Sequence, residues 1–419
     1  MEIRDAMLDV AARAKRAARS LASASGRARR KAVEDVAVLL EARKDAVTAA
    51  NAKDVEAARA AGLDPAKLQR LTVTPKVLAS MIQGCREVAA LSDPVGEIES
   101  MWKRPNGMLV GRMRIPLGVV AMIYEARPNA TVDAAVLCLM SGNACILRGG
   151  SEAFHSNAAL CAIIQEALAG AGLPVEAVQV PETKDRQAVT ELLKLNEYID
   201  VVIPRGGESL IRAVAEQATM PVLKHLKGVC HIYVDRDADL DRAVEIVLNS
   251  KTQYPSACNA LECLLVHQAV ANELLPRVAG RLAPAGVRFK ACPASLPLLG
   301  PSAEPAAEDD WGREYLDLVL AVRIVASMNE ALEHIARFGS NHTEAILTND
   351  HAKAMRFVRE VDASLVLVNA STRFNDGNQL GLGAEIGIST SKLHAYGPMG
   401  LKELTSTKFV ALGEGQVRE

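Results

Sequence analysis

Residues 117–148 read LGVVAMIYEARPNATVDAAVLCLMSGNACILR, and this stretch decides the fold class. Residues 117–124 form a continuous apolar run typical of a buried strand. Pro128 is preorganised for the first position of a helix, and a second apolar run follows at 144–147. A strand, helix and strand in this order form a βαβ unit, whose carboxyl edge is where α/β sheets bind ligands. The stretch therefore predicts an α/β protein.

Length and composition extend this prediction to the whole chain. A chain of 419 residues exceeds one compact core, so we expect two domains with a cleft. Nearly half of the residues are apolar and only 3% are aromatic, which favours helices packed on parallel sheets. The formal net charge is −2, so no field would draw the protein to nucleic acid or to an anionic membrane. We expect small-molecule partners.

The cysteines and histidines show no zinc-type spacing, so we expect no dedicated metal site. The sequence has neither a secretory apolar core nor a run long enough to cross a bilayer. We therefore expect a cytoplasmic protein whose thiols are reduced.

Two other patterns bear on organisation and binding. Residues 107–116 and 406–412 alternate in polarity, so they could pair as strands of an appendage. The segment from Pro204 through Gly206 and Gly207 precedes a predicted helix and is similar to a phosphate-binding turn. It lacks the G-x-G-x-x-G fingerprint, so an ordinary helix start is an equal alternative.

Cys258 is the candidate nucleophile. It lies in KTQYPSACNALE (251–262), with Ser, Ala and Asn beside it and a proline three residues before it. Most of the other cysteines lie in apolar runs, where a thiol usually packs in a core. The local sequence therefore favours an exposed thiol at position 258.

The order of these pieces resembles the aldehyde dehydrogenase superfamily over nearly the whole chain. The most specific motifs are IYEARPN, ILRGGSE, YPSACNALE and STRFNDGNQLGLGAEIGIST. The resemblance implies two parallel-sheet α/β domains and a small β-strand oligomerisation appendage, and hence a homo-oligomer. It places the NADP(H)-binding domain at 1–103 and 117–228, the catalytic domain at 229–395, and the appendage at 104–116 and 396–419.

The resemblance also implies roles for individual residues. Cys258 would form a thioacyl-enzyme, and the cofactor would contact Arg148, Ser151, Pro204, Gly206, Gly207 and Glu314. A neutral residue at 151 leaves room for a 2′-phosphate, which Arg148 could bind, and this favours NADP(H).

The oxyanion donor has two candidates in the turn Glu125–Asn129. Position in the turn favours Arg127, whereas residue type favours Asn129, which is our choice. Asn129 could instead only cap the helix, with the amide of Cys258 stabilising the oxyanion. Arg127, Arg373 and Ser389 are candidates for binding the substrate's charged groups.

One departure from the superfamily bears on the acceptor of the acyl group. Hydrolysing members carry a glutamate where this chain reads His225-Leu226-Lys227-Gly228-Val229. Without that base, phosphate rather than water is the expected acceptor. His225 could replace the base, although an ordinary polar contact is the more common role of such a histidine.

The motifs therefore imply NADPH-dependent reduction of L-glutamyl 5-phosphate to L-glutamate 5-semialdehyde in proline biosynthesis, with a functional link to glutamate 5-kinase. Two alternatives stay open: a coenzyme A-dependent acylating dehydrogenase, and a non-catalytic protein that has kept the fold. An assay with phosphate, coenzyme A and NADP would separate all three.

Overall fold

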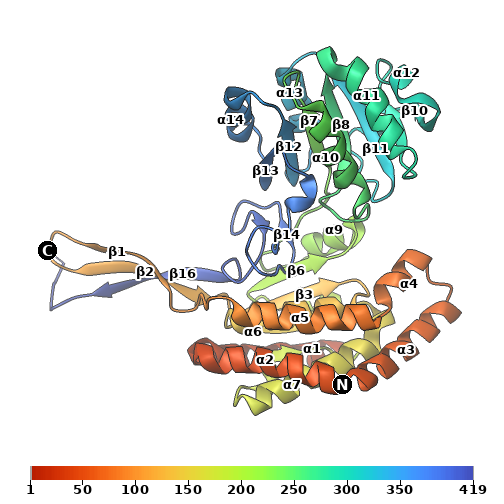
Figure 1. Ribbon diagram of the computed structural model, residues 1–419. Coiled ribbons are helices and arrows are strands. Elements are labelled where there is room, and N and C mark those ends of the chain that lie inside the picture. The colour runs from red at the N-terminus through yellow and green to blue at the C-terminus, as the bar shows by residue number, and fades with distance from the viewer. Residues whose placement is uncertain (1, 419) are drawn as a thin grey trace. The chain divides into compact units, whose positions relative to one another are not determined.

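The computed structural model describes residues 2–418, which fold as two units (Figure 1). Unit 1 comprises residues 2–224, 381–387 and 399–418, and unit 2 comprises residues 225–380 and 388–398. The α/β class predicted from the sequence is confirmed in both units, because each contains an entirely parallel sheet with helices packed on it.

Unit 1 is built on a four-stranded sheet in the order β5-β4-β3-β6. Its strands are β3 (Val119–Tyr124), β4 (Ala144–Arg148), β5 (Val178–Gln179) and β6 (Val201–Arg205). The predicted βαβ unit is confirmed: α6 (Pro128–Met140) connects β3 to β4, and both strands are fully buried. The remaining helices are α1 (Ile3–Ser23), α2 (Gly26–Ala42), α3 (Lys44–Ala60), α4 (Pro65–Leu71), α5 (Pro75–Ala90), α7 (Phe154–Gly170), α8 (Gln187–Leu192) and α9 (Glu208–Gln217).

A three-stranded antiparallel sheet extends from unit 1. Its strands β1 (Ile98–Lys103), β2 (Leu109–Pro116) and β16 (Thr405–Leu412) are ordered β1-β2-β16. The predicted pairing of the two alternating segments is confirmed, from Thr405 opposite Pro116 to Leu412 opposite Leu109. Strand β1 lies in a range that the sequence analysis gave to the cofactor domain. It belongs to the appendage because its backbone pairs with β2.

Unit 2 is built on a seven-stranded sheet in the order β10-β9-β11-β8-β7-β12-β13. Its strands are β7 (Cys230–Val234), β8 (Leu261–His267), β9 (Arg288–Ala291), β10 (Ala303–Pro305), β11 (Val319–Val325), β12 (Thr343–Leu347) and β13 (Leu365–Val368). Strand β10, which ends at Pro305, adds to the sheet beside β9. A proline is tolerated there because β10 is an edge strand.

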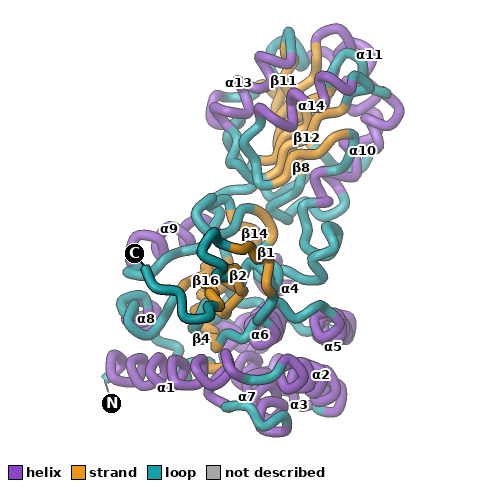
Figure 2. Tube along the Cα trace, turned by 90° about the vertical axis from the view of Figure 1, so that its left-hand side faces the viewer, coloured by secondary structure: helices purple, strands orange, loops and turns teal. Residues whose placement is uncertain are grey.

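Helices cover both faces of this sheet (Figure 2). Side chains of α10 (Leu240–Thr252) and α11 (Gln268–Leu282) form one apolar core with it, and those of α13 (Met328–Phe338) and α14 (His351–Glu360) form another. The short helix α12 (Leu296–Leu299) follows β9, and β14 (Ile388–Ser389) pairs with β15 (Gly397–Pro398) as a separate hairpin. Alternate residues of each central strand point to opposite cores, as the pleat requires.

Candidate active site

Cys258 lies in the loop between α10 and β8, where its side chain is partly exposed. The other seven cysteines are buried. Lys251 and Glu262 at the two ends of this loop are fully buried and form an ion pair, with 2.7 Å between Nζ and Oε2. This pair fixes the loop on the sheet. The structure thus gives Cys258 the exposure expected of a nucleophile, and that role stays a prediction.

Two histidines lie beside this thiol. One ring nitrogen of His225, one of His342 and the Sγ of Cys258 all lie within 4.8 Å of one another. The three residues precede β7, β12 and β8, which are neighbours in the sheet, so they meet at its amino-terminal edge. We call them the Cys258 cluster. The sequence analysis gave His225 little weight and did not consider His342, because nothing in the local sequence of either indicates the other.

The histidines change the acidity of the thiol. Burial alone raises the pKa of Cys258, but the charge of His342 and a hydrogen bond with His225 outweigh it. The pKa of Cys258 therefore lies well below that of an ordinary thiol, so the nucleophilic thiolate form is favoured.

Glu314 supports the backbone beside Cys258. Its Oε1 accepts a hydrogen bond of 2.9 Å from the amide of Gly228. A β-carbon at Gly228 would lie 1.9 Å from the carbonyl oxygen of Cys258, so only glycine allows this close approach. Residues 225–228 consequently belong to unit 2 and not to the first domain as expected. The cofactor-binding role of Glu314 stays a prediction.

Two of the predicted substrate-binding residues also lie in unit 2. The Nε of Arg373 donates to the side chain of Gln253, and its guanidinium lies 5.9 Å from the ring centre of Tyr254. Ser389 is buried, and its hydroxyl accepts a hydrogen bond from the amide of Ser391. Arg373 is thus placed by the segment that leads to Cys258, whereas Ser389 is part of β14.

A second group of the same composition lies within the sheet of unit 2. We call His231, Cys263 and His334 the Cys263 cluster, and all three are buried. His231 and Cys263 are register partners on β7 and β8. Because the sequence analysis searched only spacing along the chain, it found neither cluster, and its expectation of no metal site stays a prediction.

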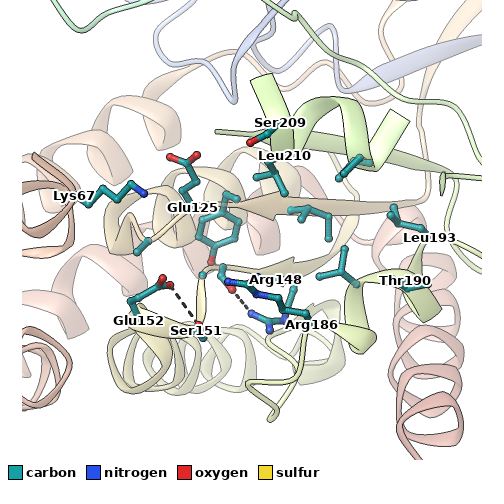
Figure 3. A pocket seen from close by; sticks show the side chains of 18 of the residues that line it. Lys67, Glu125, Arg148, Ser151, Glu152, Arg186, Thr190, Leu193, Ser209 and Leu210 are labelled. Carbon is teal, nitrogen blue, oxygen red and sulfur yellow. Dashed lines mark hydrogen bonds between the residues drawn. The ribbon is translucent and has the colours of Figure 1, made fainter. Parts of the chain in front are cut away.

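Unit 1 contains a cavity of about 510 Å³ lined by residues that follow β3 and β4 (Figure 3). Arg148 and Ser151, two of the predicted cofactor-binding residues, lie in its lining, together with Lys67 and Arg186. Both terminal nitrogens of Arg148 donate to backbone carbonyls, namely those of Gly149, Lys184 and Asp185. Arg148 therefore also fixes the segment that leads to Arg186.

The predicted phosphate-binding turn is occupied by the protein's own carboxylate. Gly207 precedes α9, and its amide donates to Oε1 of Glu125 over 2.7 Å. Pro204 is the penultimate residue of β6, and the side chain of Glu125 also packs closely against Gly206. None of these three predicted residues belongs to the lining of the cavity. The turn does attract an anion, but here it orders the β3–α6 loop.

The two oxyanion candidates lie at the start of α6. Arg127 is the N-cap residue and makes no side-chain cap. Asn129 does not cap the helix either, because its amide nitrogen donates to Asp133 one turn later over 3.3 Å. Burial raises the pKa of Asp133 to about 6. The capping alternative for Asn129 is therefore wrong, and its oxyanion role stays a prediction.

Comparison with known proteins agrees with this geometry. The model of the aldehyde dehydrogenase family matches residues 4–290. An acetylating aldehyde dehydrogenase from Geobacillus thermoglucosidasius superposes with a TM-score of 0.73 over all of this chain and 98% of its own, at 19% identity, which shows the shared fold. The chain belongs to the aldehyde dehydrogenase family.

Relatives of higher sequence identity show which members of the family this chain is most similar to. A gamma-glutamyl phosphate reductase from Maridesulfovibrio salexigens is 64% identical over 99% of both chains, and one from Nitratidesulfovibrio vulgaris is 63% identical over the full length of both. The crystal structure of gamma-glutamyl phosphate reductase from Thermotoga maritima has a TM-score of 0.96 and 46% identity, and the match covers 99% of this chain and all of that one. Within the family, the chain falls among the gamma-glutamyl phosphate reductases.

Proposed function

We propose that this protein reduces L-glutamyl 5-phosphate to L-glutamate 5-semialdehyde and phosphate, with NADPH, in proline biosynthesis. The observation that carries the proposal is Cys258, the one partly exposed cysteine, beside two histidines that lower its pKa. The thiolate attacks the acyl carbon, phosphate leaves and a thioester remains. NADPH supplies the hydride that reduces this thioester, and the aldehyde then departs from the sulfur. The amide of Cys258 and Asn129 are the proposed oxyanion donors.

The acceptor of the acyl group can be tested in the reverse reaction, the oxidation of the semialdehyde. His225 occupies the position of the hydrolytic glutamate. We propose that its imidazole serves the phosphate oxygen and not a water molecule, so the thioester should persist without phosphate. Oxidation of the semialdehyde in phosphate-free buffer should then give at most one NADPH per active site, and added phosphate or arsenate should restore turnover. Steady oxidation to free glutamate without phosphate would contradict the proposal, and turnover with coenzyme A instead would favour the acylating alternative.

NADP(H) is the proposed cofactor, and the cavity of unit 1 is its proposed site. The cavity suits a phosphorylated ribose because cationic residues outnumber acidic ones in its lining: Lys67, Arg70, Arg148 and Arg186 against Glu125 and Glu152. Ser151 adds no further negative charge. Arg148→Ala should weaken NADPH more than NADH if it binds the 2′-phosphate, and it should weaken both if its main role is to hold Lys184 and Asp185. Fluorescence titration of both cofactors separates these results, and Arg186→Ala is the matched comparison.

A homo-oligomer is proposed for the appendage. Several apolar side chains of β1, β2 and β16 are exposed, and Phe409 retains 69% of its accessible surface. Phe409→Glu should lower the oligomeric state in sedimentation experiments, while Val38→Glu on α2, an equally exposed apolar site, should not.

The proposed small-molecule reaction needs a kinase that phosphorylates glutamate, which is the basis of the proposed link to glutamate 5-kinase. Arg127, Arg373 and Ser389 are the proposed partners of the substrate's anionic groups. Among the described residues, no helix has the length and apolar character needed to cross a bilayer. All eight cysteines are free thiols, which suits the proposed cytoplasmic location.

A further inference from the structure

His225 is held in one tautomer by the backbone. Its Nδ1 lies 2.9 Å from the carbonyl oxygen of Ile388. A carbonyl oxygen can only accept, so Nδ1 carries the proton and donates it. In the neutral ring, the lone pair is therefore on Nε2. Ile388 is itself fixed by its pairing with Pro398 in the β14–β15 hairpin, so the ring orientation is set by ordered backbone.

The ring nitrogen that remains is available to the thiol. Cys258 and His225 share a hydrogen bond, and Nδ1 already binds the Ile388 carbonyl. Nε2 is consequently the nitrogen that can accept from Sγ–H. His342 differs, because its Nδ1 lies 2.8 Å from the hydroxyl of Thr343 and 3.7 Å from Sγ of Cys230. His342 also shares a hydrogen bond with Cys258, but a hydroxyl can donate or accept, so the position of the proton on the His342 ring is not fixed in the way that the Ile388 carbonyl fixes it on His225.

Charged groups of unit 2 act on this pair. His342 contributes an attraction that lowers the pKa of Cys258, and the carboxylate of Glu314 interacts with Cys258, His225 and His342. Arg373 interacts with the thiolate from the opposite segment. His342 and Arg373 favour the thiolate, whereas Glu314 opposes it and favours an imidazolium at His225.

The departing phosphate can accept the proton that Cys258 loses. At neutral pH the phosphoryl group of an acyl phosphate is mostly a dianion, so phosphate would leave as a trianion unless a proton reached it. A positioned acid that protonates the leaving oxygen typically accelerates such a step by about 10²- to 10⁴-fold.

We infer that Nε2 of His225 takes the proton of Cys258 and delivers it to the departing phosphate. This inference rests on the proposed function. The Sγ–carbon bond forms, the acyl carbon–oxygen bond breaks, and phosphate leaves as the protonated dianion while His225 becomes neutral. After the hydride of NADPH has reduced the thioester carbon, the carbon–sulfur bond breaks and the thiolate returns. One solvent proton then recharges His225 in each turnover, so the cycle balances.

Two substitutions separate a proton acceptor from a structural contact. The amide nitrogen of His225→Asn can replace Nδ1 as donor to the Ile388 carbonyl, but it offers no basic Nε2. His225→Gln lacks the base as well. The matched controls are His351→Gln, at an exposed position on α14, and His342→Gln, which tests the other ring. The thiolate of Cys258 is followed by its ultraviolet absorbance and by its alkylation rate against pH, with Cys258→Ala as the blank.

Both His225 variants should move the thiolate titration toward the ordinary thiol value of about 8.5 and slow alkylation at neutral pH by about tenfold or more. Their kcat should fall by about a hundredfold or more with little change in KM. An unchanged titration in His225→Asn, or a shift seen only in His342→Gln, would overturn the assignment. If the unmodified protein shows no phosphate-dependent turnover while the titration shifts as expected, the proposed function fails and the proton acceptor stands.

Discussion

The Cys258 and Cys263 clusters each contain one cysteine and two histidines, but their hydrogen bonds direct protons in opposite senses. In the Cys258 cluster, the carbonyl of Ile388 accepts from His225 Nδ1, so the lone pair of the neutral ring is on Nε2. In the Cys263 cluster, a nitrogen of Arg323 donates to Nδ1 of His334 over 3.2 Å, so the proton must sit on Nε2, 3.6 Å from the sulfur of Cys263. One histidine can remove a thiol proton, whereas the other can only donate toward its sulfur. The second partner of the imidazole therefore decides what a cysteine–histidine pair can do.

Electrostatics widens this difference. Burial lowers the pKa of His334 to about 3, assisted by the charge of His231, so His334 stays neutral. Burial also opposes a charge on His231, but Glu344 outweighs it and raises the pKa of His231 to about 10. The charge in the Cys263 cluster is thus neutralised inside the sheet, whereas the charge in the Cys258 cluster faces a partly exposed thiol.

The largest expected difference between the clusters is in catalysis. Cys258→Ala should lower phosphate-dependent turnover by at least about a thousandfold, because the covalent route is lost. Cys263→Ala should keep it and lose only packing, about 1–2 kcal/mol of stability. Initial rates on folded variants, checked by circular dichroism, test this. A folded Cys263→Ala that is equally inactive would move the nucleophile to the buried cluster.

The next largest effect is on stability and belongs to the Cys263 cluster. His231→Gln leaves Glu344 buried without its partner and should cost about 3–5 kcal/mol, with activity retained by the folded fraction. The pKa of His231 is raised on folding, so its contribution is complete below its unfolded value of about 6.5 and is lost as the pH rises through about 10.

Urea titrations at several pH values, read from the fluorescence of Trp311 in a Trp102→Phe background, measure this effect, because Trp311 packs on His334. His225→Asn in the same background is the control and should change stability much less. A cost of His231→Gln that grows between pH 7 and pH 10 would contradict the assigned charge.

A smaller effect is expected in thiol reactivity. Iodoacetamide should modify Cys258 and spare Cys263 in the folded protein, as peptide mass mapping can show. An ordinary thiol loses about tenfold in alkylation rate for each pH unit below its pKa of about 8.5. The pKa of Cys258 is depressed, so its rate should fall much less than tenfold between about pH 8 and pH 7. A tenfold fall between pH 8 and pH 7 would place Cys258 with ordinary thiols.

The smallest effect tests the guanidinium that orients His334. Arg323→Met removes the hydrogen bond to Nδ1 and the contact with the ring of Trp311, and should cost about 1–2 kcal/mol. Turnover should not change. Arg337→Met on the exposed side of α13 is the matched control, with an expected cost below about 1 kcal/mol. Equal costs would show that the hydrogen bond to His334 contributes little.

Local sequence patterns were sufficient to predict the strands whose side chains meet regular surroundings along the chain. The runs at 119–124 and 144–148 are apolar because both sides of their strands are covered, and the predicted strands were confirmed. The alternation of residues 406–412 likewise predicted β16 and its partner. Residues 98–103 gave no such signal, since β1 is exposed along its whole length and needs only its hydrogen bonds to β2.

The residues of the candidate site were harder to predict from the sequence, because some of them come together only in the folded chain. Cys258 was identified because its neighbours in the chain are small and polar. His342 was not, because it meets Cys258 only through the strand order β8-β7-β12, which no local pattern encodes. Gly207 shows a different case: the sequence left open whether its turn binds an anion, and in the structure its amide donates to the protein's own Glu125.

The strand β16 also fixes an order of events during synthesis. Residues 399–418 belong to unit 1, where β16 completes the sheet with β2 and the side-chain amide of Asn143 donates to the carbonyl of Leu404. The ribosome makes these residues only after all of unit 2. Unit 2 can therefore begin to fold on the nascent chain while unit 1, although made first, still has an open edge at β2. An unpaired strand edge recruits other chains, so β2 can pair with a wrong partner until β16 emerges.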